Sequence, residues 1–517
     1  MSRKACLVVA LGALVGAGCV QQSAARINAD AGVPFQVDSP AVYVAKVKNL
    51  LVGLPPTDAE VKAVIADPGA LRGLIDQWMA LPEYQQKMMV FFEIAFQQTQ
   101  ITAADFTDMI PPQGLGVGTG GQIPLLLQDL QESFARTVLA LVSSGQPLTT
   151  AFTTHQLMMT PALMELYAFL DSRHVDDNAK VTDLFAAAHP AVQITLEASQ
   201  GPIPIADTLN PASPNYMHWY NPNIGKITSY PDQTCNVDPI VLPASAYSLH
   251  LLLYGGIDSH KTPLKVGCAP RQTSGYQMAP SDFTTWKMVT LRAPQSGESI
   301  TPFYDLPTLR AAGELVLATP RVGFFSTPAF GANWPTNTSN QMRVTINQIL
   351  IVTTGMAIDG NDKTAPSSTP GLDAEHAAAG SACLGCHQLL DPTRSILSST
   401  WSWYYYPQSD PALMQQKGLF AFQGVIKPVT SIDDFAATLA SHPAVPAAWV
   451  QKLCYWANST ACDVADPEFQ RIVGVFQSSN LSWNALVKEL LSSPITTHTA
   501  LTATTAESGE VIAVARR

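Results

Sequence analysis

The chain has 517 residues, of which 47% are hydrophobic and only 13% are charged. This length allows about two to four domains of about 150 residues each, with enough apolar side chains for a sizeable core. The formal net charge of -11 argues against a nucleic-acid-binding protein, which needs a basic surface, and the low share of charge is typical of many secreted proteins.

The first residues predict a signal for export. Arg3 and Lys4 form a basic start, and the apolar run at 5–15 is too short to span a bilayer as a mature helix. Small residues follow, so we expect a signal peptide over 1–18. No later stretch reaches the roughly 18 apolar residues of a membrane span, so nothing else is expected to cross a membrane.

The small residues end at Cys19 in a pattern that resembles a bacterial lipobox, in which the cysteine becomes the lipidated first residue. Gly16 stands where that pattern prefers leucine, and an ordinary signal peptide cleaved nearby is the alternative. The polar segment that follows predicts a tether over 19–40. We therefore expect an exported lipoprotein, periplasmic or on the cell surface, that is anchored to the outer membrane through its lipid only.

Residues 41–199 predict an N-terminal helical domain. Thr57 and Glu60 have the spacing of a capping box, which opens a helix. The Gly-rich stretch 111–122 is interpreted as a linker, because no strand precedes it and no Lys-Ser/Thr pair ends it as in a phosphate-binding loop. Apolar residues at helical spacing predict the other helices of this domain at 41–54, 71–79, 83–98, 123–142 and 158–169.

Residues 200–302 lose the helical periodicity and become rich in Pro, Asn and Tyr. They predict an irregular β-containing insertion with short strands at 248–254 and 288–292. The aromatic side chains of this insertion are expected to pack its loops or, alternatively, to line a ligand surface; they include Tyr216, Trp219 and Tyr220.

The rest of the chain again predicts helices. A helical connector is expected over 303–360, followed by a Pro/Ser/Thr-rich linker and a helical domain over 371–498, while 499–517 is expected to be a disordered tail. The fold class is therefore mainly α, a multi-helix body with the irregular insertion. Its further helices are expected at 306–318, 340–352, 431–441, 447–456, 467–477 and 482–491.

The most informative stretch reads Cys383-Leu-Gly-Cys386-His387, the C-x-x-C-H motif of covalent haem c attachment. Its two thiols can each form a thioether with a haem vinyl group, and the adjacent imidazole can bind the iron. With this many Cys and His, about 0.002 matches would arise by chance. A thioredoxin-like redox pair, half of a zinc site and a short structural disulfide are the alternatives.

One covalent haem would take His387 as its proximal ligand and would make the expected helical domain over 371–498 a C-terminal cytochrome c-like haem region. Asp391 lies four residues later, on the same face of a continuing helix, and could accept a hydrogen bond from the imidazole Nδ1; a backbone carbonyl is the commoner partner. Pro392 is expected to end that helix. The aromatic run from Trp401 to Tyr406 either covers the haem or is simply core.

The remaining cysteines predict disulfides in an oxidising compartment. Once Cys6 is removed with the signal, and Cys19 and the two motif cysteines are assigned, four cysteines are left and three pairings are possible. Proximity in the sequence favours Cys235–Cys268 and Cys454–Cys462.

Several blocks together resemble the planctomycete-type cytochrome c proteins, a family of secreted and mostly uncharacterised bacterial proteins. The specific part is C-x-x-C-H followed by Asp391-Pro392; Arg394 departs from the family, which has Gly there. The resemblance implies His376 as the tentative second iron ligand, with Met356 and Met342 as alternatives. The weaker blocks lie at 53–60 with 81–84, at 321–330 with 342–343, and at 466–469 with 491–494.

Three functions follow from these features. The first is an electron-transfer cytochrome with two protein ligands on the iron and a redox partner protein. The second is a haem-dependent oxidoreductase of the oxidase or peroxidase type, with an open position on the iron and an unknown substrate. The third is a binding or structural lipoprotein without haem. No catalytic triad or carboxylate pair is recognisable, so hydrolysis is not expected.

Overall fold

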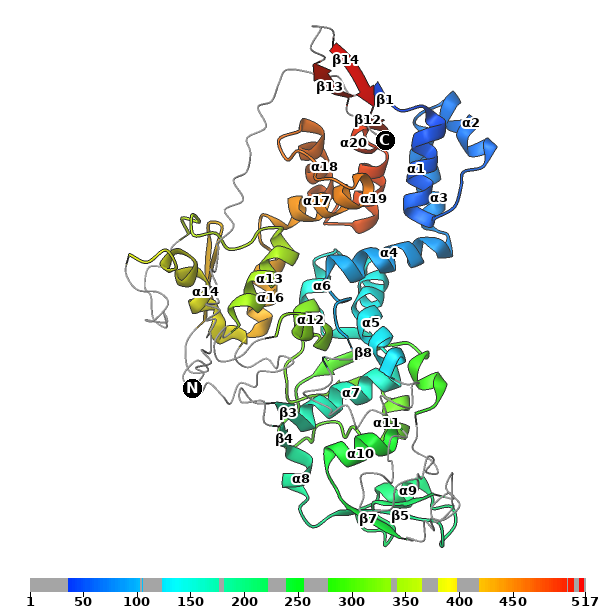
Figure 1. Ribbon diagram of the computed structural model, residues 1–517, viewed down its shortest axis with the longest axis vertical. Coiled ribbons are helices and arrows are strands. Elements are labelled where there is room, and N and C mark those ends of the chain that lie inside the picture. The colour runs from blue at the N-terminus through cyan, green and yellow to red at the C-terminus, as the bar shows by residue number, and fades with distance from the viewer. Residues whose placement is uncertain are drawn as a thin grey trace, which may run out of the picture. The chain divides into compact units, whose positions relative to one another are not determined.

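A computed structural model represents the chain (Figure 1). It describes residues 36–102, 105, 123–175, 181–221, 239–254, 278–335, 342–364, 380–397, 418–499, 501–505 and 511–515. Several predictions therefore fall wholly or almost wholly outside the described residues. They concern the signal peptide, Cys19, Cys235–Cys268, His376, the Gly-rich stretch 111–122 and the run from Trp401 to Tyr406.

The chain divides into two compact units, one of which joins the two chain ends over 1–37 and 498–517. In this smaller unit β1 (Gln36–Val37) pairs antiparallel with β12 (His498–Thr499). A second antiparallel pair joins β13 (Leu501–Thr505) to β14 (Val511–Ala515). Both strands lie in the range expected to be a tail, and they are rich in Thr, Val and Ile, which favour extended backbone.

The larger unit, over 38–497, is mainly α, as the sequence predicts. Gly53 ends the first helix in the left-handed conformation, with a φ of 70°, and Thr57 and Glu60 form the expected capping box of the second. The chain then packs a series of helices against one another before it enters the middle region. These first helices are α1 (Pro40–Val52), α2 (Asp58–Ala66), α3 (Ala70–Met79), α4 (Pro82–Ala95) and α5 (Ile123–Ser143).

The next helix differs from the amphipathic helix expected over 158–169. After the short α6 (Thr150–Thr153), residues Gln156–Met159 form strand β2, and α7 runs over Pro161–Ser172 with every residue buried. Thr160 caps α7 by accepting a hydrogen bond from the backbone N–H of Leu163. Because α7 is covered on all sides, it has no solvent-exposed face, and its sequence does not need a polar side.

Small sheets and short helices make up the described parts of the middle region. The strand expected at 248–254 is wrong: Ser245 caps a helix, α10, whose side chains pack against α7. Trp219 is fully buried, and Tyr216 and Tyr220 are half-buried. The elements are β3 (Arg173–Val175), β4 (Val181–Asp183), α8 (Leu184–Ala188), β5 (Gln193–Glu197), α9 (Ile205–Leu209), β6 (His218–Tyr220), β7 (Ile240–Pro243), α10 (Ala246–Leu253), η2 (Pro280–Phe283) and β8 (Lys287–Arg292).

Three of these strands form one sheet in the order β6-β5-β7, and another sheet has the order β2-β8-β9, with β9 at Glu314–Val316. Strand β8 confirms the strand expected at 288–292. The helix expected at 306–318 is shorter, because α11 covers only Leu306–Ala311 and the chain then extends into β9, which pairs with β8. A strand partner thus overrides the local helical pattern.

The last third of the chain returns to helices that lie close to the expected ranges. A hairpin not expected from the sequence joins β10 to β11 through Gln423 and Gly424, both with positive φ, as tight two-residue turns require. The elements are η3 (Phe324–Ser326), α12 (Pro328–Asn333), α13 (Arg343–Thr354), α14 (Leu384–Leu397), β10 (Gly418–Phe422), β11 (Val425–Val429), α16 (Ile432–Ala440), α17 (Val445–Asn458), α18 (Pro467–Ser478), α19 (Trp483–Leu491) and α20 (Pro494–Thr497).

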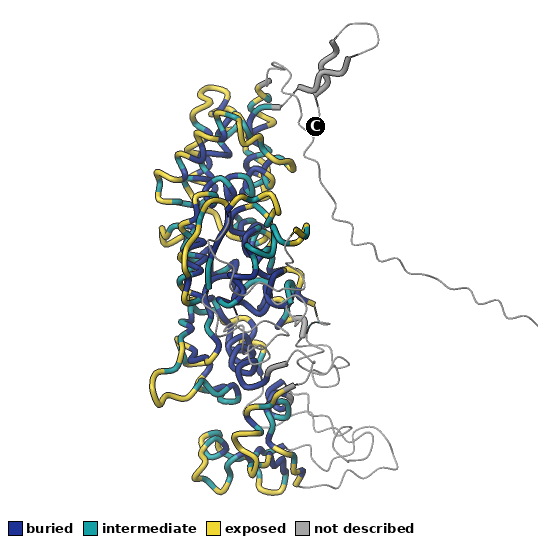
Figure 2. Tube along the Cα trace, turned by 90° about the vertical axis from the view of Figure 1, so that its left-hand side faces the viewer, coloured by how far each residue is buried: buried dark blue, intermediate teal, exposed yellow. Residues whose placement is uncertain are grey.

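Buried residues run through the larger unit (Figure 2), and an aromatic cluster joins its N-terminal and C-terminal helices into one core. The ring centroids of Phe92 on α4 and Trp483 on α19 are 4.9 Å apart, and those of Phe96 and Trp449 are 4.8 Å apart. Helices from both expected helical domains therefore share their interior.

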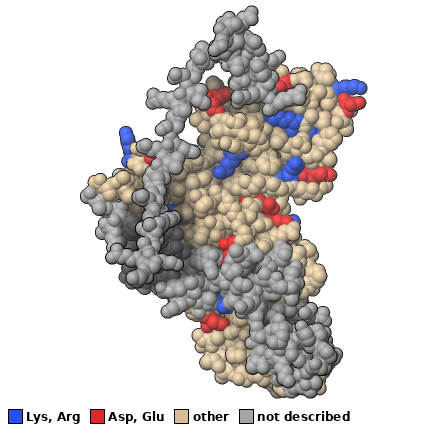
Figure 3. Space-filling model, in the orientation of Figure 1, with Lys and Arg blue, Asp and Glu red and all other residues tan. Residues whose placement is uncertain are grey.

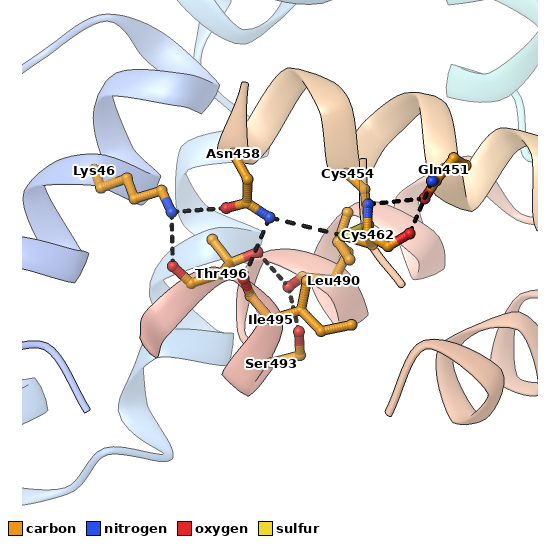
Figure 4. The surroundings of a disulfide bond; sticks show 9 residues. All are labelled: Lys46, Gln451, Cys454, Asn458, Cys462, Leu490, Ser493, Ile495 and Thr496. Carbon is orange, nitrogen blue, oxygen red and sulfur yellow. Dashed lines mark hydrogen bonds between the residues drawn. A yellow bond between two sulfur atoms is a disulfide. The ribbon is translucent and has the colours of Figure 1, made fainter. Parts of the chain in front are cut away.

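A disulfide between Cys454 and Cys462, with Cα atoms 5.9 Å apart, confirms one of the two predicted pairs. Next to it, the Asn458 amide donates to the Ile495 carbonyl and accepts a hydrogen bond from Lys46 (Figure 4). These contacts tie the end of α17 to α1 and α20. Charged side chains are sparse on the face shown in Figure 3. Among the described helices, none combines the length and the apolar content needed to cross a membrane.

Candidate functional site

The C-x-x-C-H motif forms the start of α14. Cys383 directly precedes the helix, and its carbonyl accepts a hydrogen bond of 3.0 Å from the backbone N–H of His387. Cys383 carries a free thiol and is exposed, so no disulfide joins it to Cys386, which is half-buried. The Cys383 thiol is therefore open to solvent, whereas the Cys386 thiol faces the loop at Gly360, where an added Cβ would lie 3.8 Å from its Sγ.

Between the two cysteines, Gly385 allows a loop to approach the helix closely. A Cβ atom on Gly385 would lie 2.8 Å from the carbonyl oxygen of Gly360, so any larger residue would collide with backbone. The loop is held in place because the backbone N–H of Ile358 donates to the Asn347 side chain at 2.7 Å. One side of the first turn of α14 is thus covered by the chain that follows α13.

His387 is oriented by a buried carboxylate one turn further along α14. Its Nδ1 lies 3.2 Å from Oδ2 of Asp391, whose side chain is fully buried. The i, i+4 spacing puts the two side chains on one face of the helix. Because Nδ1 faces this carboxylate, Nε2 is the imidazole nitrogen that would bind a metal.

Two arginines surround the other oxygen of this carboxylate. Nε of Arg343, the first residue of α13, lies 2.7 Å from Oδ1 of Asp391, and Nε of Arg394 lies 3.5 Å from the same atom. All three side chains are at most 10% exposed. A buried carboxylate needs such partners, because water cannot stabilise its charge there.

Arg394 therefore has a structural role at the position where the resembled family has Gly. The Asp391–Arg394 spacing of three residues is a signal that could have identified this pair from the sequence. The contact with Arg343 could not have been identified in this way, since 48 positions separate the two residues.

Pro392 does not end the helix as expected. It lies inside α14, which continues to Leu397. Proline removes one helical hydrogen bond, but its surroundings hold the backbone: the Thr393 hydroxyl donates to the carbonyls of Leu389 in the same helix and of Leu419 in β10. Packing against β10 thus carries the helix past the proline.

The structure brings Cys383, Cys386, His387 and Asp391 together on one helix. Met342 is buried beside Arg343 with a φ of 69°, and Met356 lines a separate cavity that is described below. The tentative second ligand, His376, is outside the described residues.

The donor set fits covalent haem c. This group needs two thiols for the porphyrin and only one imidazole for the iron, so the three side chains need not converge on one point. A zinc site would need them to converge, and the described residues hold no group of three or more His, Cys, Asp or Glu side chains that could bind one metal ion.

Comparison with known proteins adds no relative: the chain matches no protein-family model, no curated protein and no solved structure. The functional argument therefore depends on the motif and its surroundings.

Proposed function

We propose that the chain is an exported mono-haem c-type cytochrome-like lipoprotein that transfers electrons at the bacterial cell envelope. The observation that carries this proposal is the C-x-x-C-H motif at the start of α14, with Cys383 a free exposed thiol and His387 oriented by buried Asp391. Haem-dependent oxidation of a substrate remains the alternative within the same haem chemistry.

Each residue of the site has a defined task in this proposal. The thiols of Cys383 and Cys386 would hold the haem: each S–H would add across one vinyl C=C bond, with sulfur on one carbon and the hydrogen on the other, so that no group leaves. His387 presents Nε2, and Asp391 fixes the ring by accepting a hydrogen bond from Nδ1, which increases the basicity of the ligand. Haem, when bound, would supply a one-electron carrier. Asp391, with the two arginines that contact it, would keep the imidazole of His387 in position.

An electron carrier needs its imidazole ligand held in one orientation, and the buried contacts of Asp391 with Arg343 and Arg394 support that role. The electron donor or acceptor would be a redox partner protein, and the predicted lipid on Cys19 would keep the chain at the membrane.

Covalent haem staining tests the proposal. The full precursor should be produced in a bacterium that matures c-type cytochromes, and the purified protein should retain haem on a denaturing gel, with one haem per chain. Cys383→Ser with Cys386→Ser should abolish the stain. The matched control, Cys454→Ser with Cys462→Ser, removes two cysteines outside the motif and should keep it.

The absorption spectrum then separates the two haem functions. A low-spin reduced spectrum with two protein ligands is the expected result for an electron carrier. A high-spin spectrum would favour the oxidoreductase instead. Wild-type protein without covalent haem would refute both.

A further inference from the structure

A second candidate site lies away from the cysteine motif. An open cavity of about 700 Å³ is bounded by α4, the end of α13, the start and middle of α17 and the loop that contains Val464. No residue of α14 lines it. Its volume is in the range of pockets that hold small molecules, about 300–1,000 Å³.

The cavity wall is mainly apolar. Phe91 and Ile94 from α4, Met356 after α13 and Ala447 from α17 contribute to it. At its rim Ile94, Tyr455 and Val464 are 57%, 58% and 56% exposed. Large apolar side chains gathered around an opening favour a ligand with a hydrocarbon body.

One cation stands in this apolar wall. The Lys452 ammonium donates to the Ile351 carbonyl at a long 3.4 Å and lies 5.7 Å from the Trp449 ring centre. Among the described residues no carboxylate lies within ion-pair distance of it. Burial lowers the pKa of this lysine to about 8, so it is still mostly protonated at neutral pH.

A second donor lies beside it. Trp456 lines the same cavity, one helical turn after Lys452, and its buried Nε1–H has no hydrogen-bond acceptor in the described part of the chain. A half-buried cation without a carboxylate partner and a buried N–H without an acceptor are both unfavourable, so a ligand that brings an anionic oxygen would satisfy them together.

The disulfide loop makes this cavity a pre-formed one. The Gln451 side chain donates to the Cys462 carbonyl at 2.9 Å and accepts from the Cys462 backbone N–H at 3.2 Å. Together with the Cys454–Cys462 bond, these contacts hold the loop that carries Val464 against α17 (Figure 4). Because this wall is already fixed, little conformational entropy is lost when a ligand binds.

We propose that this cavity binds an amphipathic carboxylate of the fatty-acid class, with its alkyl chain against Phe91, Ile94 and Met356 and its carboxylate at Lys452 and Trp456. This inference does not depend on the haem proposal, because none of its residues belongs to the cysteine motif.

Calorimetric titration with decanoate and 1-decanol at pH 7 tests the proposal on the full exported protein. These two probes share the alkyl chain and differ in the charge of the head group. Wild-type protein should bind decanoate more tightly than decanol. Lys452→Met should weaken decanoate binding about 10- to 100-fold, the loss of one charged hydrogen bond, and should leave decanol binding unchanged.

Two further variants locate the binding. Ala447→Phe adds a ring to the cavity wall and should weaken both probes, while Lys62→Met, at an exposed position of α2, should change neither. Near-ultraviolet circular dichroism shows that each variant is folded. The proposal is overturned if wild type shows no saturable binding, if Lys452→Met binds decanoate as wild type does, or if Ala447→Phe binds both probes unchanged.

Discussion

A single buried carboxylate organises the region around the cysteine motif. Asp391 contacts His387 one turn earlier and Arg394 one turn later in α14, and it contacts Arg343 at the start of α13. Its charge has no access to water, so the free energy of the site depends on these partners. The residue therefore couples the orientation of the imidazole to the packing of two helices.

Removal of Arg343 tests this coupling. Arg343→Ala leaves a buried carboxylate without its shortest ion pair, so the free energy of unfolding should fall by about 3 kcal/mol. The control is Arg292→Ala, since Arg292 pairs with Glu298 and Glu314 at the surface and water replaces its contacts. Urea unfolding of both variants is the measurement. Equal losses would show that Asp391 does not depend on Arg343.

Replacement of Lys452 should have the opposite effect and increase the free energy of unfolding. Its pKa is about 8 in the folded protein against 10.5 in an exposed lysine, so the charged form opposes folding below pH 8. The unfolded chain binds more protons between these two values, and stability should rise with pH across this window. Lys452→Met should therefore stabilise the protein by up to about 3 kcal/mol at pH 7, at about 1.4 kcal/mol per unit of pKa.

Urea unfolding at pH 7 and at pH 10 measures this effect. The advantage of the Lys452→Met variant over wild type should shrink at the higher pH, because wild type has by then lost its buried charge. A constant advantage would mean that apolar packing, rather than the charge, is responsible. A lysine that lowers stability in this way is expected where a ligand, and not the fold, needs the charge.

At the scale of elements, local sequence signals predicted most helices. They failed where contacts with distant parts of the chain determine the secondary structure. Regular apolar spacing predicted α1, α3, α4, α5 and the helices from α16 to α19 to within a few residues. The apolar composition of the segment after Ser245 is compatible with a strand or a helix, and packing against α7 favours the helix. The short α11 gives way to β9 because β8 offers a strand partner.

The candidate site likewise has contacts that the sequence predicts and contacts that it does not. The spacing of the cysteines, His387 and Asp391 lies within one helix, so the sequence alone indicates how they can meet. The contributions of Arg343 and of Gly360 depend on the path of the chain over dozens of residues and carry no local signal. The passage of α14 through Pro392 depends likewise on the contact between Thr393 and β10.

The close approach of Gly360 to Gly385 gives a prediction at this scale. Gly385→Ala would place a methyl group 2.8 Å from a backbone oxygen, so the loop or the helix must move. We expect a loss of about 1–3 kcal/mol in stability, as in overpacked interiors, and a lower yield of covalent haem. Thermal unfolding and the haem stain are the two measurements.

A second glycine in a helix is the matched control. Gly474 in α18 has no atom within 4 Å of an added Cβ, so Gly474→Ala should stabilise its helix by about 0.5–1 kcal/mol. Unchanged stability and haem yield in Gly385→Ala would contradict the tight contact at the motif.

At the scale of the whole molecule, the larger unit is held together by contacts between its sequence-distant ends. Phe92 contacts Trp483 in α19, and Phe96 contacts Trp449 in α17. The Lys46 ammonium donates to Asn458 at 2.8 Å and to the Thr496 carbonyl at 2.9 Å. Neither end of this unit can bury its aromatic side chains without the other, so the two should unfold together.

Phe92→Ala should therefore destabilise both ends at once. The ring is fully buried, so its loss should cost about 3–5 kcal/mol. Amide hydrogen exchange should speed up in α19 as much as in α4, although almost 400 residues separate them, because the shared core opens as one unit. Ile65→Ala, at a 61% exposed position of α2, should leave exchange in α19 unchanged. Faster exchange confined to α4 would instead divide the two ends into independently folding parts.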